Sequence, residues 1–317
     1  LQWNNCIYYN TARHCNHRLD AQHNGTIMHA AISNCSDPRT YDRKRQKPAP
    51  VTFVTYESND WYNQREILSK YTETWTVDKI GNGSAIPGKL QHGWQWGTGI
   101  DDEGVDRIRH TNVQSWVWNK RNETTAKDLH IKSVAIGAPI LYSPIIDIAE
   151  EPITSGVLVI PSHSQPPFQI RQWEDTVRET NWFCNDFKQK TVLLYYRDYS
   201  YAKQFYENYG FTVCCLGGPY AKGYLDRLKL LILVHELVIG DKISTSSFYA
   251  NMWNRPFLKL GSPLETEIID PFAGPGGDNE FIEKEFPHFL TGKINKDLAL
   301  KELGYKCKKS KSELKDL

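Results

Sequence analysis

Short apolar segments recur at regular intervals through the second half of the chain. They are rich in β-branched and aromatic residues, and several show no alternation with polar residues, which is typical of strands buried on both faces of a parallel sheet. They are Gly156 to Pro161, Thr191 to Tyr196, Phe211 to Gly217, Glu236 to Gly240 and Pro256 to Gly261. Apolar stripes with helical spacing lie between them, at 199–209, 224–232 and 248–253. This alternation predicts a Rossmann-like half.

The first half of the chain shows a similar but less regular pattern. Strands are expected at 51–57, 72–78, 115–119 and 133–137, with a helix at 62–71. A polar, proline-containing stretch from Ser143 to Ser155 separates the two halves and is the candidate linker. We therefore expect an α/β protein with two domains, at residues 1–145 and 146–317.

Composition narrows the class of protein. The chain has 317 residues, 40% of them hydrophobic, which is enough apolar material for a core. Its net charge is +1, so charge gives no support to nucleic-acid binding. The basic run Lys306 to Lys315 is expected to be a solvated end, with a weak attraction to an anionic membrane surface. No apolar run approaches the roughly 20 residues of a membrane span, and no signal peptide is expected.

Seven cysteines are scattered along the chain without the spacing of metal ligands. Their odd number, and the apolar surroundings of Cys214 and Cys215, are typical of free thiols in a reducing cytosol. We therefore expect a cytoplasmic protein without a metal site.

Four hydroxyl residues follow one of the expected buried strands. A short loop with Asp241 comes first, and Ser244, Thr245, Ser246 and Ser247 then fall at the start of the next helix. Free backbone N–H groups and the helix dipole make such a helix start suitable for a phosphate. The alternative is that these side chains only cap the helix. Four such residues at the carboxyl end of a parallel strand favour a ligand.

Two further segments are expected on the same rim of the sheet. Ser162 and His163 follow the first strand of the second half, and His163 has the chemistry to hydrogen-bond or protonate a leaving phosphate. Arg197 follows the next strand and is expected to help hold that phosphate. The alternative for His163 is a solvated loop histidine.

A glycine-rich loop in the first half holds the candidate general base. The candidates are His92, which precedes Gly93, and the acidic run Asp101, Asp102 and Glu103. A general base that deprotonates an acceptor hydroxyl contributes about 10²–10⁴-fold to a rate. The alternative for the acidic run is a solvated loop.

The order of these segments resembles a known family. The segments are "LQHGW", "SWVWNKRN", "VLVIPSHS", "VLLYYRDYSYAKQFYENYGFTVCCLG" and "ELVIGDKISTSSFYANMWNRPFLKLG". Together they resemble bacterial polysaccharide glycosyltransferases of the GT-B architecture, over roughly residues 90–317. The resemblance implies two Rossmann-like domains that face each other across a cleft, with the acceptor on the first and a nucleotide sugar on the second. It also implies inverting transfer without a metal.

Two related groups imply different bases. Bacterial sialyltransferases carry a His-Pro pair and a Ser-Ser or Ser-Thr pair that hold the donor, and His163 and Ser244 to Ser247 lie at matching places. Ser164 stands where the proline would be, which leaves the donor open. Their acidic base motif is matched by Asp102 to Gly104, whereas the His-Gly pair of teichoic-acid glycerophosphotransferases is matched by His92-Gly93. We rank His92 first and Asp102 second.

Two short strings resemble a different family. "DPFAGPGG" (Asp270 to Gly277) is similar to an S-adenosylmethionine loop, and "QPPF" (Gln165 to Phe168) to an amino-methyltransferase tetrapeptide. Only Ile268 and Ile269 offer a strand before the first string, and no strand is expected after it. Its glycines and prolines are therefore interpreted as turn residues. Just before it, Glu265 and Glu267 are candidates for a ribose contact.

The resulting hypothesis is a cytoplasmic glycosyltransferase, peripheral at the inner face of the membrane. It would move a sugar from a nucleotide sugar to a surface polysaccharide or a lipid-linked glycan, with no cofactor beyond the donor substrate. Two alternatives stay open: a methyltransferase, and a non-catalytic sugar-nucleotide-binding module, because a fold alone does not imply catalysis.

Overall fold

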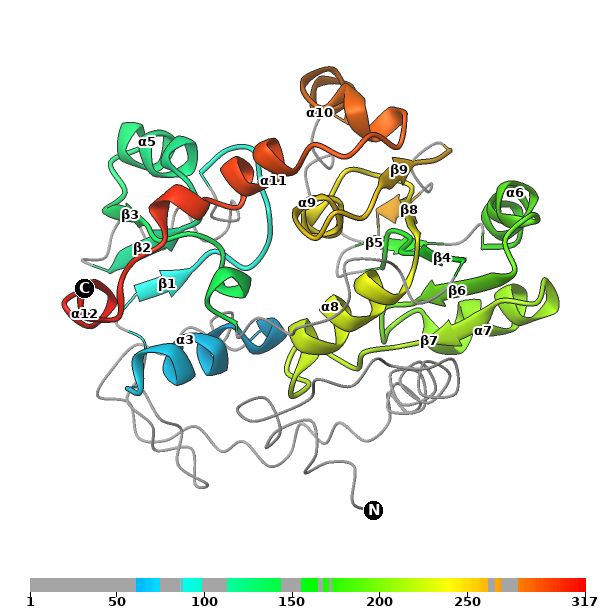
Figure 1. Cartoon of the computed structure of the whole chain (residues 1–317), viewed down its shortest axis with the longest axis horizontal. Coiled ribbons are helices and arrows are strands. Elements are labelled where there is room, and N and C mark those ends of the chain that lie inside the picture. Colours follow the sequence, from blue (N-terminus) through cyan, green and yellow to red (C-terminus); the bar gives the residue numbers. More distant parts are fainter. Residues whose placement is uncertain are drawn as a thin grey trace, which may run out of the picture.

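The described part of the chain contains two parallel sheets with helices packed on them (Figure 1). The computed structural model describes residues 61–74, 86, 88–98, 113–143, 155–164, 168–170, 173–261, 266–268 and 279–317. In these residues the protein is α/β, as the alternation of apolar strands and amphipathic helices predicts.

The larger sheet has five strands that all run parallel. They are β4 (Gly156–Val159), β6 (Gln189–Leu193), β7 (Thr212–Cys214), β8 (Leu237–Gly240) and β9 (Phe257–Lys259), which confirms the five expected segments. The spatial order is β7-β6-β4-β8-β9, so the chain starts at the centre, moves to one edge and then crosses to the other side of β4. This is the order of a doubly wound sheet, with its topological switch point between β4 and β8.

Helices cover both faces of this sheet. They are α6 (Trp173–Cys184), α7 (Tyr199–Asn208), α8 (Tyr224–Val234) and α9 (Thr245–Met252), and the last three confirm the expected helical stripes. Successive strand residues point to opposite faces. Val157 and Val159 accordingly share a core with α6 and α7, whereas Leu158 between them belongs to the core that contains α8 and α9.

The smaller sheet has three parallel strands in the order β1-β2-β3. These are β1 (Gly88–Leu90), β2 (Gln114–Val117) and β3 (Ser133–Ala135), with α3 (Gln64–Thr72), α5 (Lys120–Asp128) and the 3-10 turn η4 (Pro139–Tyr142) beside them. The expected strands at 115–119 and 133–137 and the helix at 62–71 are confirmed. The expected strand at 72–78 does not begin at Thr72, because that residue ends α3; positions 51–57 and 75–78 lie outside the described residues.

The C-terminal segment returns to the smaller sheet. It contains α10 (Asn279–Glu285), η5 (Pro287–Leu290), α11 (Lys296–Glu302), η6 (Tyr305–Cys307) and α12 (Lys311–Lys315). The Ala138 N–H donates to the Leu303 carbonyl at 2.8 Å, and Leu314 is fully buried. Lys311 forms an ion pair with Glu73, which follows α3. The basic run is therefore a docked element with exposed lysines, and the expectation of a merely solvated end is wrong.

Two short strands pair outside the parallel sheets. β5 (Phe168–Ile170) and β10 (Thr266–Ile268) are antiparallel to each other. The string from Asp270 to Gly277 follows β10 and lies outside the described residues. A phosphate- or cofactor-binding turn of the Rossmann type follows a strand of the parallel sheet. β10, with its antiparallel partner, does not have that setting.

An apolar core is continuous between the two sheets. Leu68 and Trp116 from the smaller sheet and its helix belong to the same buried cluster as Leu231, Phe248 and Phe257 from the larger one. The expected linker falls mainly at 144–154, which is outside the described residues. Among the described helices, none combines the length and apolar character needed to cross a bilayer. The described cysteines, at 184, 214, 215 and 307, are free thiols.

Candidate functional site

Loops from three neighbouring strands meet at the switch point of the larger sheet. The Ser162 N–H, just after β4, donates to Oδ1 of Asp241 after β8 at 2.7 Å. Two residues on, the Ser164 N–H donates to Oδ2 of Asp198 after β6 at 2.8 Å. Both carboxylates are buried, at 9% and 3% exposure. The loop that carries His163 is therefore held by a hydrogen bond on each side of that residue. The Asp241 carboxylate is used in accepting a backbone N–H group of this loop.

His163 is held by its ring as well as by its neighbours. Its ring stacks on Tyr195, with centroids 4.2 Å apart and planes 30° apart. Its Nδ1 lies 3.2 Å from the Ser164 carbonyl, and because a carbonyl only accepts, Nδ1 carries the proton in this contact. Burial, followed by the nearby Lys242 ammonium, lowers the pKa of His163 below its ordinary value. The ring is therefore neutral at pH 7, with Nε2 as an acceptor.

The four hydroxyl residues at the start of α9 have different roles. The Ser244 N–H donates to Oγ of the buried Ser247 at 3.0 Å, and the Ser244 side chain accepts the Ser247 N–H in return, so the capping alternative describes both serines. Oγ1 of Thr245 accepts the Trp94 N–H at 2.8 Å. Ser244 and Ser246 are half-buried at the helix start, beside the exposed Lys242. These two hydroxyls and the first N–H groups of α9 are the donors that suit an anion.

The loop after β1 reaches this helix start. His92 belongs to it, and its carbonyl accepts from Nε2 of Gln64 at 2.9 Å while its ring meets Trp61 edge-on at 5.0 Å. A methyl group on Gly93 would lie 3.3 Å from Oγ1 of Thr245. The structure therefore brings the predicted His92-Gly93 pair and the predicted hydroxyl cluster together, although they lie about 150 residues apart.

A contact between two tyrosines, Tyr62 before α3 and Tyr224 of α8, joins the two halves of the structure beside these loops. Tyr62 meets the Tyr224 ring at a centroid distance of 4.8 Å, and its N–H donates to the Pro219 carbonyl at 2.5 Å. Burial raises the pKa of the Tyr62 and Tyr195 phenols, so both stay neutral. Tyr62 and Asn63 have φ of 57° and 68°, in the left-handed region that ordinary residues avoid. The backbone at Tyr62 and Asn63, where this contact is made, is thus held in a strained conformation.

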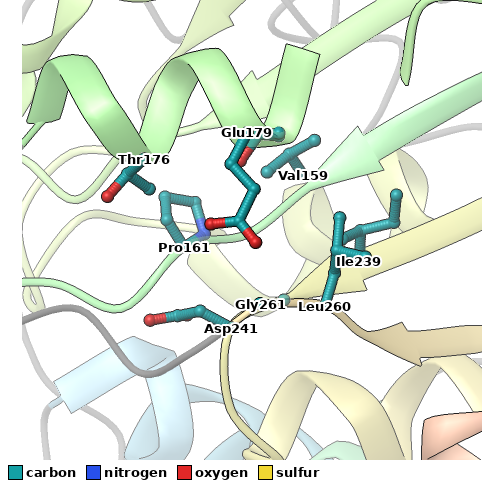
Figure 2. A pocket seen from close by; sticks show the side chains of 10 residues that line it. Val159, Pro161, Thr176, Glu179, Ile239, Asp241, Leu260 and Gly261 are labelled. Atoms are coloured by element: carbon teal, nitrogen blue, oxygen red, sulfur yellow. The ribbon is translucent and has the colours of Figure 1, made fainter. Parts of the chain in front are cut away.

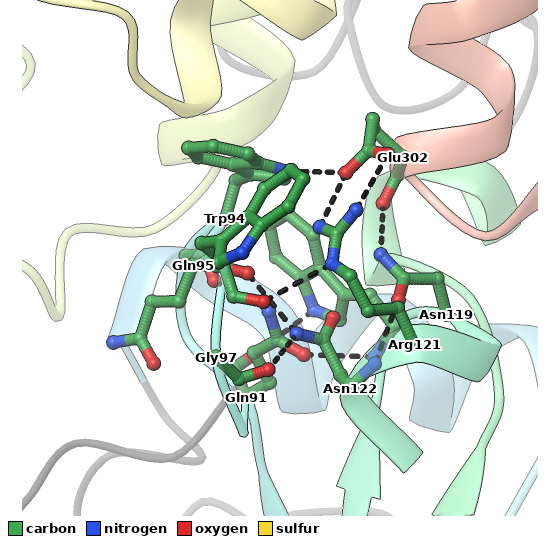
Figure 3. A network of polar contacts seen from close by, with 11 residues as sticks. Gln91, Trp94, Gln95, Gly97, Asn119, Arg121, Asn122 and Glu302 are labelled. Atoms are coloured by element: carbon green, nitrogen blue, oxygen red, sulfur yellow. Dashed lines mark hydrogen bonds and ion pairs between the residues drawn. The ribbon is translucent and has the colours of Figure 1, made fainter. Parts of the chain in front are cut away.

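The loop after β1 is also tied to the C-terminal segment. The tie is made of Trp94, Asn119, Arg121, Asn122 and Glu302 (Figure 3). Glu302 is 3% exposed, and its carboxylate accepts from both Trp94 and Arg121.

A small pocket lies on the other side of the switch point, under α6. Figure 2 shows Glu179 pointing into it between Pro161 and Gly261, with Asp241 at its edge. Its volume is about 30 Å³, which is room for one or two water molecules. It is too small for a nucleotide, so we place the candidate ligand site on the α9 side of the rim.

The remaining predicted residues are spread around the rim. Arg197 is exposed after β6, where its Nε donates to the Tyr196 hydroxyl at 3.0 Å. Glu267 lies in β10 opposite Gln169 of β5. Asp101, Asp102, Glu103 and Glu265 lie outside the described residues. No cluster of three or more His, Cys, Asp or Glu that could hold a metal occurs within the described ranges.

Several site residues were missed by the sequence reasoning. They are Tyr62, Asp198, Tyr195 and Lys242 in the rim, and Arg121 and Glu302 behind the loop after β1. Lys242 had a usable signal, because it directly follows Asp241 at the end of a buried strand. No family model matches the chain, and no curated protein matches its sequence significantly.

Proposed function

We propose that the protein is a glycosyltransferase of the GT-B type, with a nucleotide sugar bound at the carboxyl edge of the larger sheet. The observation that carries the proposal is the meeting of the His92 loop with the start of α9 at a topological switch point. Ligands of open parallel sheets bind at that position. The loop that carries a general-base candidate contacts a helix start that suits a phosphate, and transfer from a nucleotide sugar would use both.

Charge at the rim supports a phosphate-containing ligand. The dipole of α9 contributes only about 0.3–1 kcal/mol. Lys242 and Arg197 are exposed cations after β8 and β6 that add to it. The buried Asp198 and Asp241 carboxylates accept backbone N–H groups, and this offsets the repulsion they would otherwise exert on an anion.

The proposed reaction is a displacement at the anomeric carbon. His92, or alternatively Asp102, takes the proton of an acceptor hydroxyl. The acceptor oxygen then bonds to the anomeric carbon while the bond from that carbon to the donor phosphate breaks, with inversion. The electron pair stays on the phosphate, where the start of α9, Ser244, Ser246 and Lys242 stabilise the charge.

His163 changes protonation state in this proposal. With its proton on Nδ1, the neutral ring offers Nε2 to a donor hydroxyl or amino group. A bound phosphate raises the pKa of a neighbouring histidine and so favours the imidazolium, whose Nε2–H can donate to the phosphate. Stacking on Tyr195 holds the ring in the same place for either contact.

The surface-glycan acceptor and the location at the inner membrane face belong to the same proposal. Exposed lysines of the docked C-terminal segment support attraction to anionic lipid, at about 1 kcal/mol for each lysine near the surface.

The experiment is a sugar-transfer assay on His92→Ala, with Asp102→Asn as the matched variant. Loss of the base is expected to lower kcat by about 10²–10⁴-fold with donor binding intact. Retained transfer in His92→Ala with loss in Asp102→Asn would assign the base to Asp102. Nucleotide-sugar binding without transfer to any acceptor would support a non-catalytic module instead.

A further inference from the structure

The carboxylate of Glu302 is buried and fully engaged. Its Oε1 accepts from Arg121 at 2.8 Å, and its Oε2 accepts from Arg121 at 2.5 Å and from Nε1 of Trp94 at 2.9 Å. The carbonyl of the same residue accepts from Nδ2 of Asn119 at 2.8 Å. Burying such a pair costs desolvation that the attraction only partly offsets, so the pair is weak evidence for stability. The contacts of this ion pair instead show which segment of the chain it positions.

Arg121 and its neighbour hold the loop after β1 by its backbone. Nε of Arg121 donates to the Trp96 carbonyl at 3.1 Å, and the guanidinium lies over the Trp96 ring, 4.0 Å from its centroid. Nδ2 of Asn122 donates to the Gln95 and Gly97 carbonyls at 3.0 and 2.6 Å. Three consecutive carbonyls are thus fixed by the start of α5. Figure 3 shows Asn122 reaching Gln95 and Gly97.

This network of contacts reaches the candidate site through Trp94. Trp94, whose indole donates to Glu302, donates its backbone N–H to Oγ1 of Thr245 and packs on Phe248 of α9 at a ring distance of 4.6 Å. His92 lies two residues before Trp94 in the same loop. The placement of this loop against the start of α9, which Gly93 and Trp94 contact directly, therefore depends on a segment about 200 residues away in the sequence.

We propose that Arg121 and Glu302 form a positioning latch, through which the C-terminal segment holds the His92 loop at the start of α9. The latch rests on the proposed function for its purpose, because it sets the distance between base and donor phosphate. Its physical action, restraint of residues 91–98, does not depend on that function.

The test is amide hydrogen exchange of residues 91–98 in Glu302→Gln. Glu123→Gln is the matched control: Glu123 is also buried, at 6% exposure, and pairs with Lys120 and Lys127, but the structure shows no contact of its side chain with the described part of this loop. Glu302→Gln is expected to speed exchange of this segment at least about fivefold, since each lost hydrogen bond removes about 1 kcal/mol. Glu123→Gln is expected to leave it unchanged.

Two further variants keep the test decisive if Glu302→Gln does not fold. Arg121→Lys keeps the charge but loses the bidentate geometry, and Thr245→Val removes the acceptor for the Trp94 N–H. Both should speed exchange in the same segment. Unchanged exchange in Glu302→Gln and Arg121→Lys, or an equal rise in Glu123→Gln, would overturn the latch, whatever Thr245→Val shows. Absence of sugar transfer in the wild-type protein would overturn the proposed function and leave this result standing.

Discussion

His235 is fully buried and His163 is half-buried, and only His163 lies at the rim. His235 is fully buried, and its Nδ1 donates to the Leu231 carbonyl at 2.7 Å while Nε2 lies 2.9 Å from Oγ1 of Thr191. Both ring nitrogens are therefore satisfied by a neutral ring between α8 and β6. Burial lowers the pKa of His235 from 6.5 to about 4.

This pKa predicts a specific acid sensitivity. As the pH falls below 6.5, the unfolded chain binds a proton at His235 while the folded chain does not, so stability is lost until the folded pKa near 4 is reached. The loss amounts to about 3 kcal/mol between pH 7 and pH 4. Urea unfolding of wild type and His235→Gln at both pH values should show a drop smaller by about that amount in the variant. Equal drops would contradict the assignment of this sensitivity to His235.

The junction between α11 and η6 depends on a close approach of backbones. Gly304 has φ of 73°, and a methyl group there would overlap the Trp118 carbonyl oxygen and contact Gly137. Gly292, before α11, has φ of 67° but open space around it. The two glycines share a left-handed backbone conformation, but only Gly304 is crowded by other atoms. Comparing them therefore separates the cost of backbone strain from the cost of a steric clash.

Substitution at these glycines therefore gives unequal losses. Gly292→Ala is expected to cost about 1 kcal/mol, from left-handed strain alone. Gly304→Ala is expected to cost about 3–5 kcal/mol, because the C-terminal segment must also move away from β2. Chemical denaturation measures both. Similar losses at the two sites would mean that the C-terminal segment does not pack as described.

The elements that sequence predicted share a clear signal. The five strands of the larger sheet are continuous apolar runs, and α7 to α9 have apolar stripes. α5 was missed because its sequence KRNETTAKD has a single buried apolar residue, Ala126; its start is fixed by the Asn119 side chain, which accepts the Asn122 N–H. The three-residue β1 is too short for a pattern.

The candidate site was predictable to the extent that parallel strands place their carboxyl ends on one edge. That rule placed Ser162, His163 and Asp241 on one edge, and a hydrogen bond joins Ser162 to Asp241 there. It says nothing of contacts between distant loops, so the Tyr62–Tyr224 contact and the Arg121–Glu302 pair could not be predicted. These contacts depend on how the two sheets pack.

The C-terminal segment connects the two sheets and the site. It crosses from α9, where the Asn295 N–H donates to Oδ1 of Asn251 at 2.8 Å, back to the smaller sheet and α3 (Figure 1). Together with the shared apolar core, this crossing fixes the carboxyl ends of β1 and β8 against each other. The proposed acceptor and donor sides of the site are thereby held in one arrangement.

The central claim is that a nucleotide sugar binds at the start of α9. The most direct measurement is a thermal-shift panel of cytidine, uridine, guanosine and thymidine sugar nucleotides together with S-adenosylmethionine, on wild type and Lys242→Gln. A ligand at 100 times its Kd stabilises by about 2.7 kcal/mol. We expect one nucleotide class to raise the Tm, with a smaller shift in Lys242→Gln. Stabilisation by S-adenosylmethionine alone, or by a nucleotide equally in both proteins, would contradict the claim.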